Sequence, residues 1–470
     1  MSDLRDVSAS SATTSGQRES LSAGIALQLA HRLNRPVGAV DRARARLHLL
    51  DWLACVVAGS VEPGAAEPRR LAALEGAGPC RVIRGASCGP QAAALANGPA
   101  GALLEMDDVD RRGLLHPGPV VFPAVLAAAD AAGVVDGVQI LDAAVRGYEA
   151  MIRVGRAVGP GHASRFHVTA TCGGFGAAAG AASVLGLDAL QTAWALGNAG
   201  QQAFGLWQVR HEPVFTKALH DGRAAANGLA AAFLARDGYA GPLGIFEGPH
   251  GFFHGLCPDG APEAMLDGGE AWAIHEVSFK PHAACRHAHA AIDAVLELRE
   301  RVARRALQRL RIGVYGDALT FCDRPSPHTP GEAKFSLQHA AAVAWLHGDA
   351  DLSRFTLEAI ADPAVSVLRG RVELFRDSGC DDRYPAHFGA VAEAVLDDGA
   401  VLRVEAPDAL GDPEKPMDAA ALIAKAHALF AWGGMTHGDA EALVSAALSL
   451  GEEASMADVW ACAPSEAKGE

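Results

Sequence analysis

The chain has 470 residues, a formal net charge of −15, and half of its residues are hydrophobic. These values predict a globular protein with a large core and more than one domain. The acidic balance argues against nucleic acid as a general partner, because there is no global basic field to release counterions. Nine cysteines without a CxxC pair favour a reduced, cytoplasmic protein.

Helical periodicity dominates the first part of the chain. After the Ser/Thr-rich segment 1–20, for which we expect a disordered tail, apolar residues recur at three- and four-residue spacing. The uncharged stretch 168–187 has the length of a membrane span, but its Gly/Ala content and the lack of an aromatic belt favour a buried helix. We therefore predict a helical domain over 21–270 and no membrane partner.

The pattern changes near residue 271, where short alternating runs with β-branched residues begin. Such runs occur in "AIHEVSFKP", "LQRLRIGVYGDAL" and "AVSVLRGRVELFRD", and "GAVAEAVLDDGAVLRVEAP" reads as a hairpin with "DDG" at its turn. Helical segments lie between them. We predict an α+β domain over 271–408, with a helical segment 409–470 that rejoins the first domain. The predicted fold class is mainly α: a large all-α domain plus a smaller α+β domain.

Common cofactor and nucleophile motifs find little support in the sequence. There is no P-loop, and no GxGxxG lies between a strand and a helix. "GASCG" matches GxSxG, but no oxyanion loop accompanies it, so an ordinary turn is preferred to a Ser87 nucleophile. His287 and His289 would lie on different helix faces, and His289 and Asp293 could share one. Without a second such pair nearby, we predict no metal site.

Charged residues and histidines gather in four places. These are Asp107, Asp108, Asp110, Arg111, Arg112 and His116; His167 before a small-residue helix; Arg210, His211, Lys217, His220 and Arg223; and Lys280, His282, Arg286, His287 and His289. Arg and Lys bind carboxylates, and His or Lys moves protons near neutral pH. If these clusters meet in space, they would suit a small carboxylic acid.

Motifs from about residue 25 to 450 resemble, in order, those of the MmgE/PrpD family. They include "NGPAGALLEMDDVD", "HPGPVVFPAVLAAAD", "GYEAMIRVG", "FHVTATCGGFGAAAG", "TKALHDGRAAANG", "FKPHAACRHAHAAIDA" and "RPSPHTPGEAKFSLQHAAAVAWLHGD". The resemblance implies a helical domain built from both chain ends, an α+β lid, a homodimer and no cofactor. The activities it implies are 2-methylcitrate dehydration, cis-aconitate decarboxylation and iminodisuccinate epimerisation. All of them move a proton next to a carboxylate of a small di- or tricarboxylic acid.

The resemblance also assigns candidate site residues. The positions that match the family's motifs, and that we take as catalytic, are Asp107, His116, His167, Lys217 and Lys280. The substrate-binding candidates are His220, Arg223, Cys285, Arg286 and His289. In chemical terms, Lys217, Lys280 and Arg286 would clamp carboxylates, and His116 or His167 would transfer a proton. Asp107 would hold a histidine in one tautomer.

The sequence departs from the family at several of these motifs. Arg111 and Arg112 follow the aspartates where many members have Thr and often His, and they either face a third carboxylate or lie at the surface. Decarboxylating members carry a histidine at the position of Cys285 and a tyrosine at Phe321. We therefore favour a hydro-lyase of the dehydratase type over a decarboxylase. The alternatives are an epimerase or isomerase of a small dicarboxylate, and an inactive carboxylate-binding protein.

Overall fold

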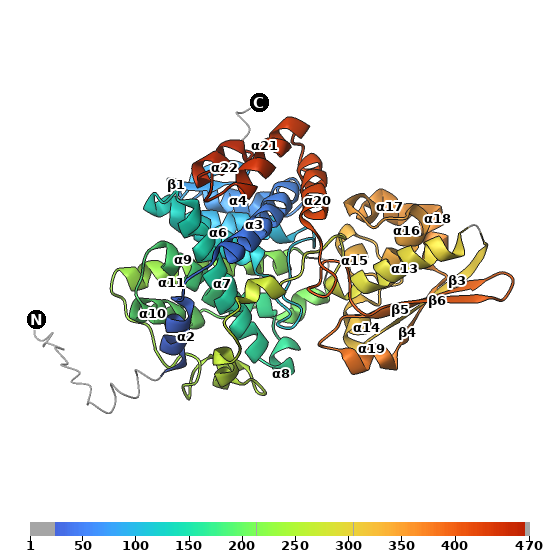
Figure 1. Ribbon diagram of the computed structural model, residues 1–470, viewed down its shortest axis with the longest axis horizontal. Coiled ribbons are helices and arrows are strands. Elements are labelled where there is room, and N and C mark those ends of the chain that lie inside the picture. Colours follow the sequence, from blue (N-terminus) through green and yellow to red (C-terminus); the bar gives the residue numbers. More distant parts are fainter. Residues whose placement is uncertain (1–23, 213, 304, 466–470) are drawn as a thin grey trace, which may run out of the picture.

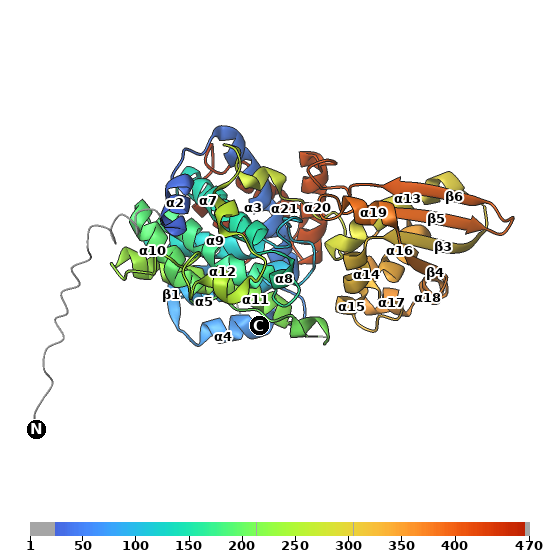
Figure 2. The same ribbon diagram turned by 90° about the horizontal axis from the view of Figure 1, so that it is seen from below.

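The computed structural model describes residues 24–212, 214–303 and 305–465, so the tail predicted at 1–20 lies outside the described residues. Helices dominate these residues, and their strands form a two-stranded and a four-stranded sheet. Figures 1 and 2 show a large helical part and, beside it, a smaller part that contains the four-stranded sheet. The predicted fold class, mainly α with a smaller α+β part, is confirmed.

The larger part is built around α9 (Val168–Val184), the uncharged Gly/Ala-rich segment. This helix packs between α7 (Gly137–Ala157) and α11 (Thr216–Arg236). A Cβ on Gly228 of α11 would lie 2.3 Å from the backbone oxygen of Gly174, so these helices approach closely because their facing residues are small. Across the described residues, none of the helices has both the length and the hydropathy that a membrane span needs.

Further helices and one hairpin surround this centre. They are α2 (Ile25–Leu33), α3 (Ala39–Gly59), α4 (Ala66–Ala73), β1 (Ala77–Val82), β2 (Gly85–Cys88), α5 (Pro90–Ala102), α6 (Gly118–Ala132), α8 (Pro160–Ala163), α10 (Ala189–Gly200), α12 (Phe252–Leu256), α20 (Ala419–Trp432), α21 (His437–Leu448) and α22 (Met456–Cys462). The C-terminal helices α20 and α21 pack on α3, so both ends of the described chain contribute to the helical part (Figure 1). Ser87 lies exposed within strand β2, whereas the serine of a nucleophile elbow sits at the turn itself.

The smaller part contains the four-stranded sheet in the order β4-β3-β5-β6. Its elements are α13 (His289–Val302), β3 (Leu307–Val314), α14 (Gly316–Cys322), α15 (Pro330–Lys334), α16 (Leu337–His347), α17 (Leu357–Ala361), α18 (Pro363–Arg369), β4 (Val372–Arg376), α19 (Ser378–Arg383), β5 (Ala390–Leu396) and β6 (Val401–Ala406). β3 pairs in parallel with β4 and antiparallel with β5. β5 and β6 form the predicted hairpin, and α13 packs on both.

Two of the strand-like runs adopt other structures. The first half of "AVSVLRGRVELFRD" is helix α18, because Pro363 occupies its first turn and the Asp362 side chain caps the amides of Ala364 and Val365. The run "AIHEVSFKP" begins as a 3-10 helix, Ala273–Glu276, and then makes a single antiparallel bridge. In α18, these helix-start signals outweighed the β-branched residues.

Candidate active site

The charged stretch of the sequence forms a loop between α5 and α6, residues 103–117, here called the acidic loop. Val109 forms the antiparallel bridge with Ser278, which brings the segment of Lys280 alongside the loop. The carboxylate of Asp108 accepts hydrogen bonds from the Tyr148 hydroxyl at 2.7 Å and from the Gly118 amide at 2.8 Å. The loop is thus fixed from both sides.

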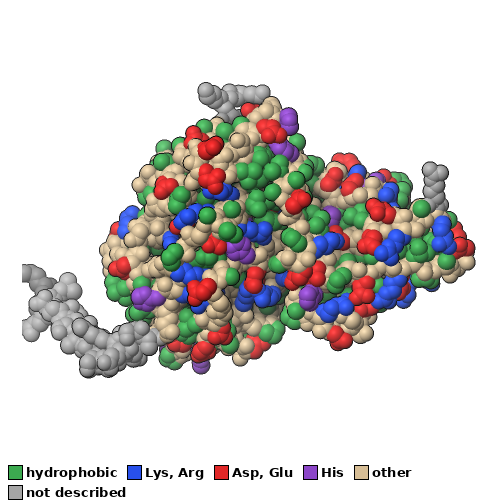
Figure 3. All heavy atoms as spheres, in the orientation of Figure 1, with side chains coloured by type: hydrophobic (Ala, Val, Ile, Leu, Met, Phe, Trp, Pro, Cys, Tyr) green, Lys and Arg blue, Asp and Glu red, His purple; other side chains and the backbone are tan. Residues whose placement is uncertain are grey.

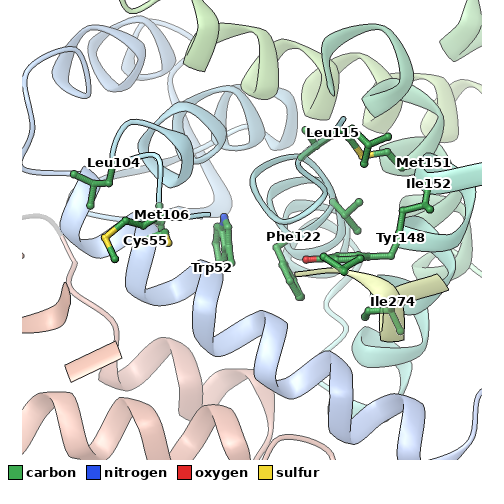
Figure 4. Packing of buried hydrophobic residues seen from close by; sticks show 14 of the residues in the cluster. Trp52, Cys55, Leu104, Met106, Leu115, Phe122, Tyr148, Met151, Ile152 and Ile274 are labelled. Carbon is green, nitrogen blue, oxygen red and sulfur yellow. The ribbon is translucent and has the colours of Figure 1, made fainter. Parts of the chain in front are cut away.

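Apolar packing and a buried lysine support the acidic loop. Leu104, Met106 and Leu115 of the loop belong to the same buried hydrophobic cluster as Trp52, Phe122 and Tyr148 of the core (Figure 4). Lys425 of α20 donates to the Met106 backbone oxygen at 2.6 Å and to Asp51 at 2.5 Å. The C-terminal segment therefore holds the backbone next to Asp107 in place.

Four of the five predicted catalytic residues belong to one ion-pair network. His116 Nδ1 lies 2.7 Å from Asp107 Oδ2, and Lys280 Nζ lies 3.2 Å from Asp107 Oδ1. Glu105 completes the network, because Lys217 Nζ pairs with its Oε1 and Lys280 Nζ lies 3.6 Å from its Oε2. The sequence reasoning missed Glu105, although it stands two residues before Asp107 in the acidic motif.

Burial and neighbouring charges set the protonation of this network. Burial alone would raise the pKa of Asp107, but Lys280 and His116 outweigh it and hold that pKa below its ordinary value. Lys217 has a raised pKa, because Glu105 and Asp107 overcome its desolvation. The carboxylates and Lys217 are therefore charged at neutral pH. Asp107 fixes the tautomer of His116 and leaves Nε2 of that ring to exchange protons.

His167 lies beside this network, at the start of α9. Its Nδ1 is 3.2 Å from Nδ1 of His220 on α11, and its Nε2 is buried without a hydrogen-bond partner among the described residues. The hydroxyl of Thr169, the second residue of α9, accepts a hydrogen bond from the backbone amide of His116 at 3.1 Å. Burial, with Lys217 second, lowers the pKa of His167 well below 6.5 and that of His220 to about 4. Both rings are neutral near pH 7.

The low pKa of His220 predicts an acid-sensitive stability. Between pH 6.5 and 4 the unfolded chain binds a proton that the folded chain does not, so the free energy of unfolding should fall as pH falls through this window. Denaturant unfolding across this range should show a smaller fall in His220→Gln than in the wild type. His347→Gln, at an exposed position, is the control. Equal falls in both variants would contradict the prediction.

Two further buried groups lie close to the network, and the sequence reasoning missed both. Asp221 follows Lys217 by one turn of α11, and its Oδ1 has no hydrogen-bond partner among the described residues. Burial raises the pKa of Asp221 well above its ordinary value. Lys334, at the end of α15, donates to the Leu103 backbone oxygen at 3.3 Å. Asp221 could have been found from its four-residue spacing from Lys217 on a predicted helix. Lys334 could have been found from its place in the quoted motif "GEAKFSLQ".

The other predicted residues occupy different surroundings. Arg286 pairs with Asp412, which lies outside the acidic loop. Arg223 is exposed on α11, and His289 contacts the Ala284 backbone oxygen at the start of α13. Cys285 is buried, its backbone amide donates to the Lys334 oxygen at 2.8 Å, and a hydrogen bond with Cys322 lowers its pKa. The structure thus brings Cys285 beside Lys334.

Arg111 and Arg112 differ in their surroundings. Arg111, with 6% of its side chain exposed, lies 3.1 Å from Asp412 and also pairs with Asp408 and Glu414. Arg112 is a surface residue that pairs with Glu276. Arg111 therefore serves neither of the two roles we considered, because it joins the acidic loop to the segment after β6.

This difference predicts unequal effects on stability. Arg111→Met should lower the free energy of unfolding by about 3 kcal/mol, because it leaves buried carboxylates with fewer cations. Arg112→Met should change it by less than about 1 kcal/mol, because exposed ion pairs contribute little. Chemical denaturation of the two variants measures both values. Equal effects would contradict the assignment of Arg111 as the buried partner.

The geometry defines a class of protein: a largely buried network of lysines, carboxylates and histidines, suited to acid–base chemistry on an anion. Lys280 is 0% exposed, His167 2% and Asp107 3%. Residues 33–265 match the family model of the MmgE/PrpD N-terminal domain, and residues 282–450 match that of the MmgE/PrpD C-terminal domain. The chain belongs to the MmgE/PrpD family, and it is an enzyme of the lyase type.

Three proteins that are similar to this chain are named as cis-aconitate decarboxylases or as like them. The cis-aconitate decarboxylase-like protein oryM of Aspergillus oryzae is 32% identical over 76% of this chain and 80% of its own length. The cis-aconitate decarboxylase of Aspergillus terreus is 31% identical over 55% of this chain and 56% of its own length. The human cis-aconitate decarboxylase is 30% identical over 61% of each chain. This chain thus spans less than two thirds of the latter two proteins.

Proposed function

We propose that this chain is a hydro-lyase that removes water from a small di- or tricarboxylic acid. The observation that carries the proposal is the buried network in which Asp107 holds His116 while Lys280 and Lys217 surround the two carboxylates of the acidic loop. Such a site favours the carbanion-like charge that develops when a proton leaves the carbon next to a carboxylate. The proposed steps use side chains of this chain alone.

His167 is the proposed base. Its ring is neutral, and its buried Nε2 has no protein partner among the described residues, so it is able to accept the α-proton. The charge that develops on the substrate carboxylate is stabilised by nearby lysines. His116, oriented by Asp107, then donates a proton to the departing hydroxide. A carbon–carbon double bond and one water molecule are the products.

Most of the network is buried, but Lys217 and His116 keep 23% and 14% of their side chains exposed. Lys334 of the smaller part reaches Leu103 at the end of α5, so a shift of that part would break this contact and expose the network. The smaller part would then act as a lid that excludes water when it closes. The homodimer and the cytoplasmic location that the family resemblance implies stay predictions.

Decarboxylation is the second candidate, and the names of the relatives favour it. The ring of Phe321 stacks on His287, with centroids 4.8 Å apart, and the Arg210 guanidinium lies 3.9 Å from the Phe321 ring centroid. Phe321 offers no hydroxyl to a reacting carboxylate. For this reason dehydration remains the preferred reaction of the three. Epimerisation is the third candidate, because it uses the same proton abstraction.

A proton NMR screen in heavy water tests these reactions. The acids are citrate, 2-methylcitrate, cis-aconitate, itaconate, the tartrates and iminodisuccinate. Loss of water with a new olefinic signal supports the dehydratase, release of carbon dioxide supports the decarboxylase, and α-deuteration without loss of water supports the epimerase. If none of the acids is changed, the proposal fails for these substrates. His347→Gln, at an exposed position, should behave as the wild type.

A further inference from the structure

The two lysines assigned as carboxylate clamps are already neutralised by carboxylates of the chain. Lys217 pairs with Glu105, and Lys280 lies 3.2 Å from Asp107 and 3.6 Å from Glu105. A substrate carboxylate that bound between these lysines would have to displace an internal one. The displaced group would then be buried without a cation, which costs several kcal/mol. A carboxylate therefore needs another cation at this site.

Lys334 is the buried cation that lacks such a partner. It is 5% exposed, and among the described residues no carboxylate oxygen lies within ion-pair distance of its Nζ, which donates only to the Leu103 backbone oxygen at 3.3 Å. The next residue, Phe335, has its ring centroid 5.6 Å from Lys217 Nζ, which places Lys334 beside the network. The backbone of Lys334 is held by the 2.8 Å hydrogen bond from Cys285.

We propose that Lys334 is the residue that binds a carboxylate of the substrate, so that Lys217 and Lys280 keep their internal partners. This inference rests on the proposed function, because it assigns a ligand to the same site. The reason is charge balance. An anion that binds Lys334 gains a buried cation without breaking an ion pair, and it gives up only a hydrogen bond to a backbone oxygen.

Carboxylate binding at Lys334 should be linked to proton uptake. Burial lowers the pKa of Lys334 to about 8; Glu62 and Glu105 oppose the shift, and Lys280 and Lys217 add to it. A bound anion raises this pKa. Binding near pH 8.5 should therefore take up a proton, whereas at pH 6.5 Lys334 is already protonated and little uptake should occur.

Isothermal titration calorimetry of the full chain tests the proposal. Citrate and cis-aconitate are titrated at both pH values, each in two buffers of different ionisation enthalpy, which reports the protons exchanged. Lys334→Met should weaken binding at least about tenfold and abolish the uptake. Lys334→Arg should keep the binding without the uptake, because arginine stays charged. Lys415→Met, an exposed lysine paired with Asp293, is the matched control and should behave as the wild type.

A stability measurement separates binding from a structural role. Lys334→Met removes a buried cation that has no carboxylate partner, so its thermal midpoint should stay at or above that of the wild type. A loss of stability as large as that of Lys280→Met would show an ion-pair role and overturn the proposal.

Two further outcomes of the binding measurements test the proposal. Unchanged affinity in Lys334→Met, with tighter binding in Glu105→Gln, would place the carboxylate between Lys217 and Lys280 and overturn this inference alone. If neither acid binds the wild-type chain, this inference is overturned for both acids, and the proton NMR screen of the wider set of acids decides the proposed function separately.

Discussion

Lys280→Met is expected to lower the free energy of unfolding by about 3–5 kcal/mol. Lys280 is fully buried and lies within 3.6 Å of carboxylate oxygens of both Asp107 and Glu105. Methionine fills a similar volume but leaves two buried carboxylates with fewer compensating charges. Urea denaturation monitored by circular dichroism measures the loss.

A double variant identifies the cause of this loss. Lys280→Met combined with Glu105→Gln should recover part of the stability, because one of the uncompensated charges is gone. Lys415→Met removes an exposed lysine and should cost less than about 1 kcal/mol. If Lys280→Met were as stable as Lys415→Met, the buried network would not have the energetic role that its geometry indicates.

His116→Gln is expected to reduce the rate of water loss by about 10²- to 10⁴-fold, the usual contribution of a general acid or base. Under the proposed mechanism this variant keeps His167, so it should still exchange the α-proton of its substrate for deuterium. His167→Gln should lose both the exchange and the water loss. Proton NMR in heavy water follows the two events in one experiment.

The comparison of the two variants assigns the roles. If His116→Gln loses exchange while His167→Gln retains it, the base and the acid are reversed. Folding is checked by thermal denaturation, and His347→Gln provides an exposed histidine control. Full activity in both variants would exclude both rings from proton transfer.

The sequence predicted the helical part well, because apolar periodicity and small residues in α9 reflect burial directly. It predicted the β5–β6 hairpin from its turn residues. It failed at α18, where β-branched residues indicated a strand. There the Asp362–Pro363 pair, a start signal for a helix, decided the structure locally.

The candidate site was also predicted only in part from the sequence. Motifs in the sequence identified Asp107, His116, Lys217 and Lys280, and the structure brings these four together. The sequence did not identify the partner of Lys217, which is Glu105. Nor did the sequence separate Arg111 from its neighbour Arg112. The structure buries Arg111 among carboxylates and leaves Arg112 exposed. Adjacent residues of one type carry the same local signal.

By itself, the sequence determined the family, the mainly α fold class and the residue types that the site uses, because these depend on patterns along the chain. The tertiary structure alone decided which lysines beside the acidic loop are neutralised and which of them, among the described residues, lacks a carboxylate partner. Lys217 and Lys280 pair with the acidic loop, whereas Lys334 meets only a backbone oxygen among the described residues. Charge compensation depends on distance and burial, and segments that are more than a hundred residues apart in the sequence set both.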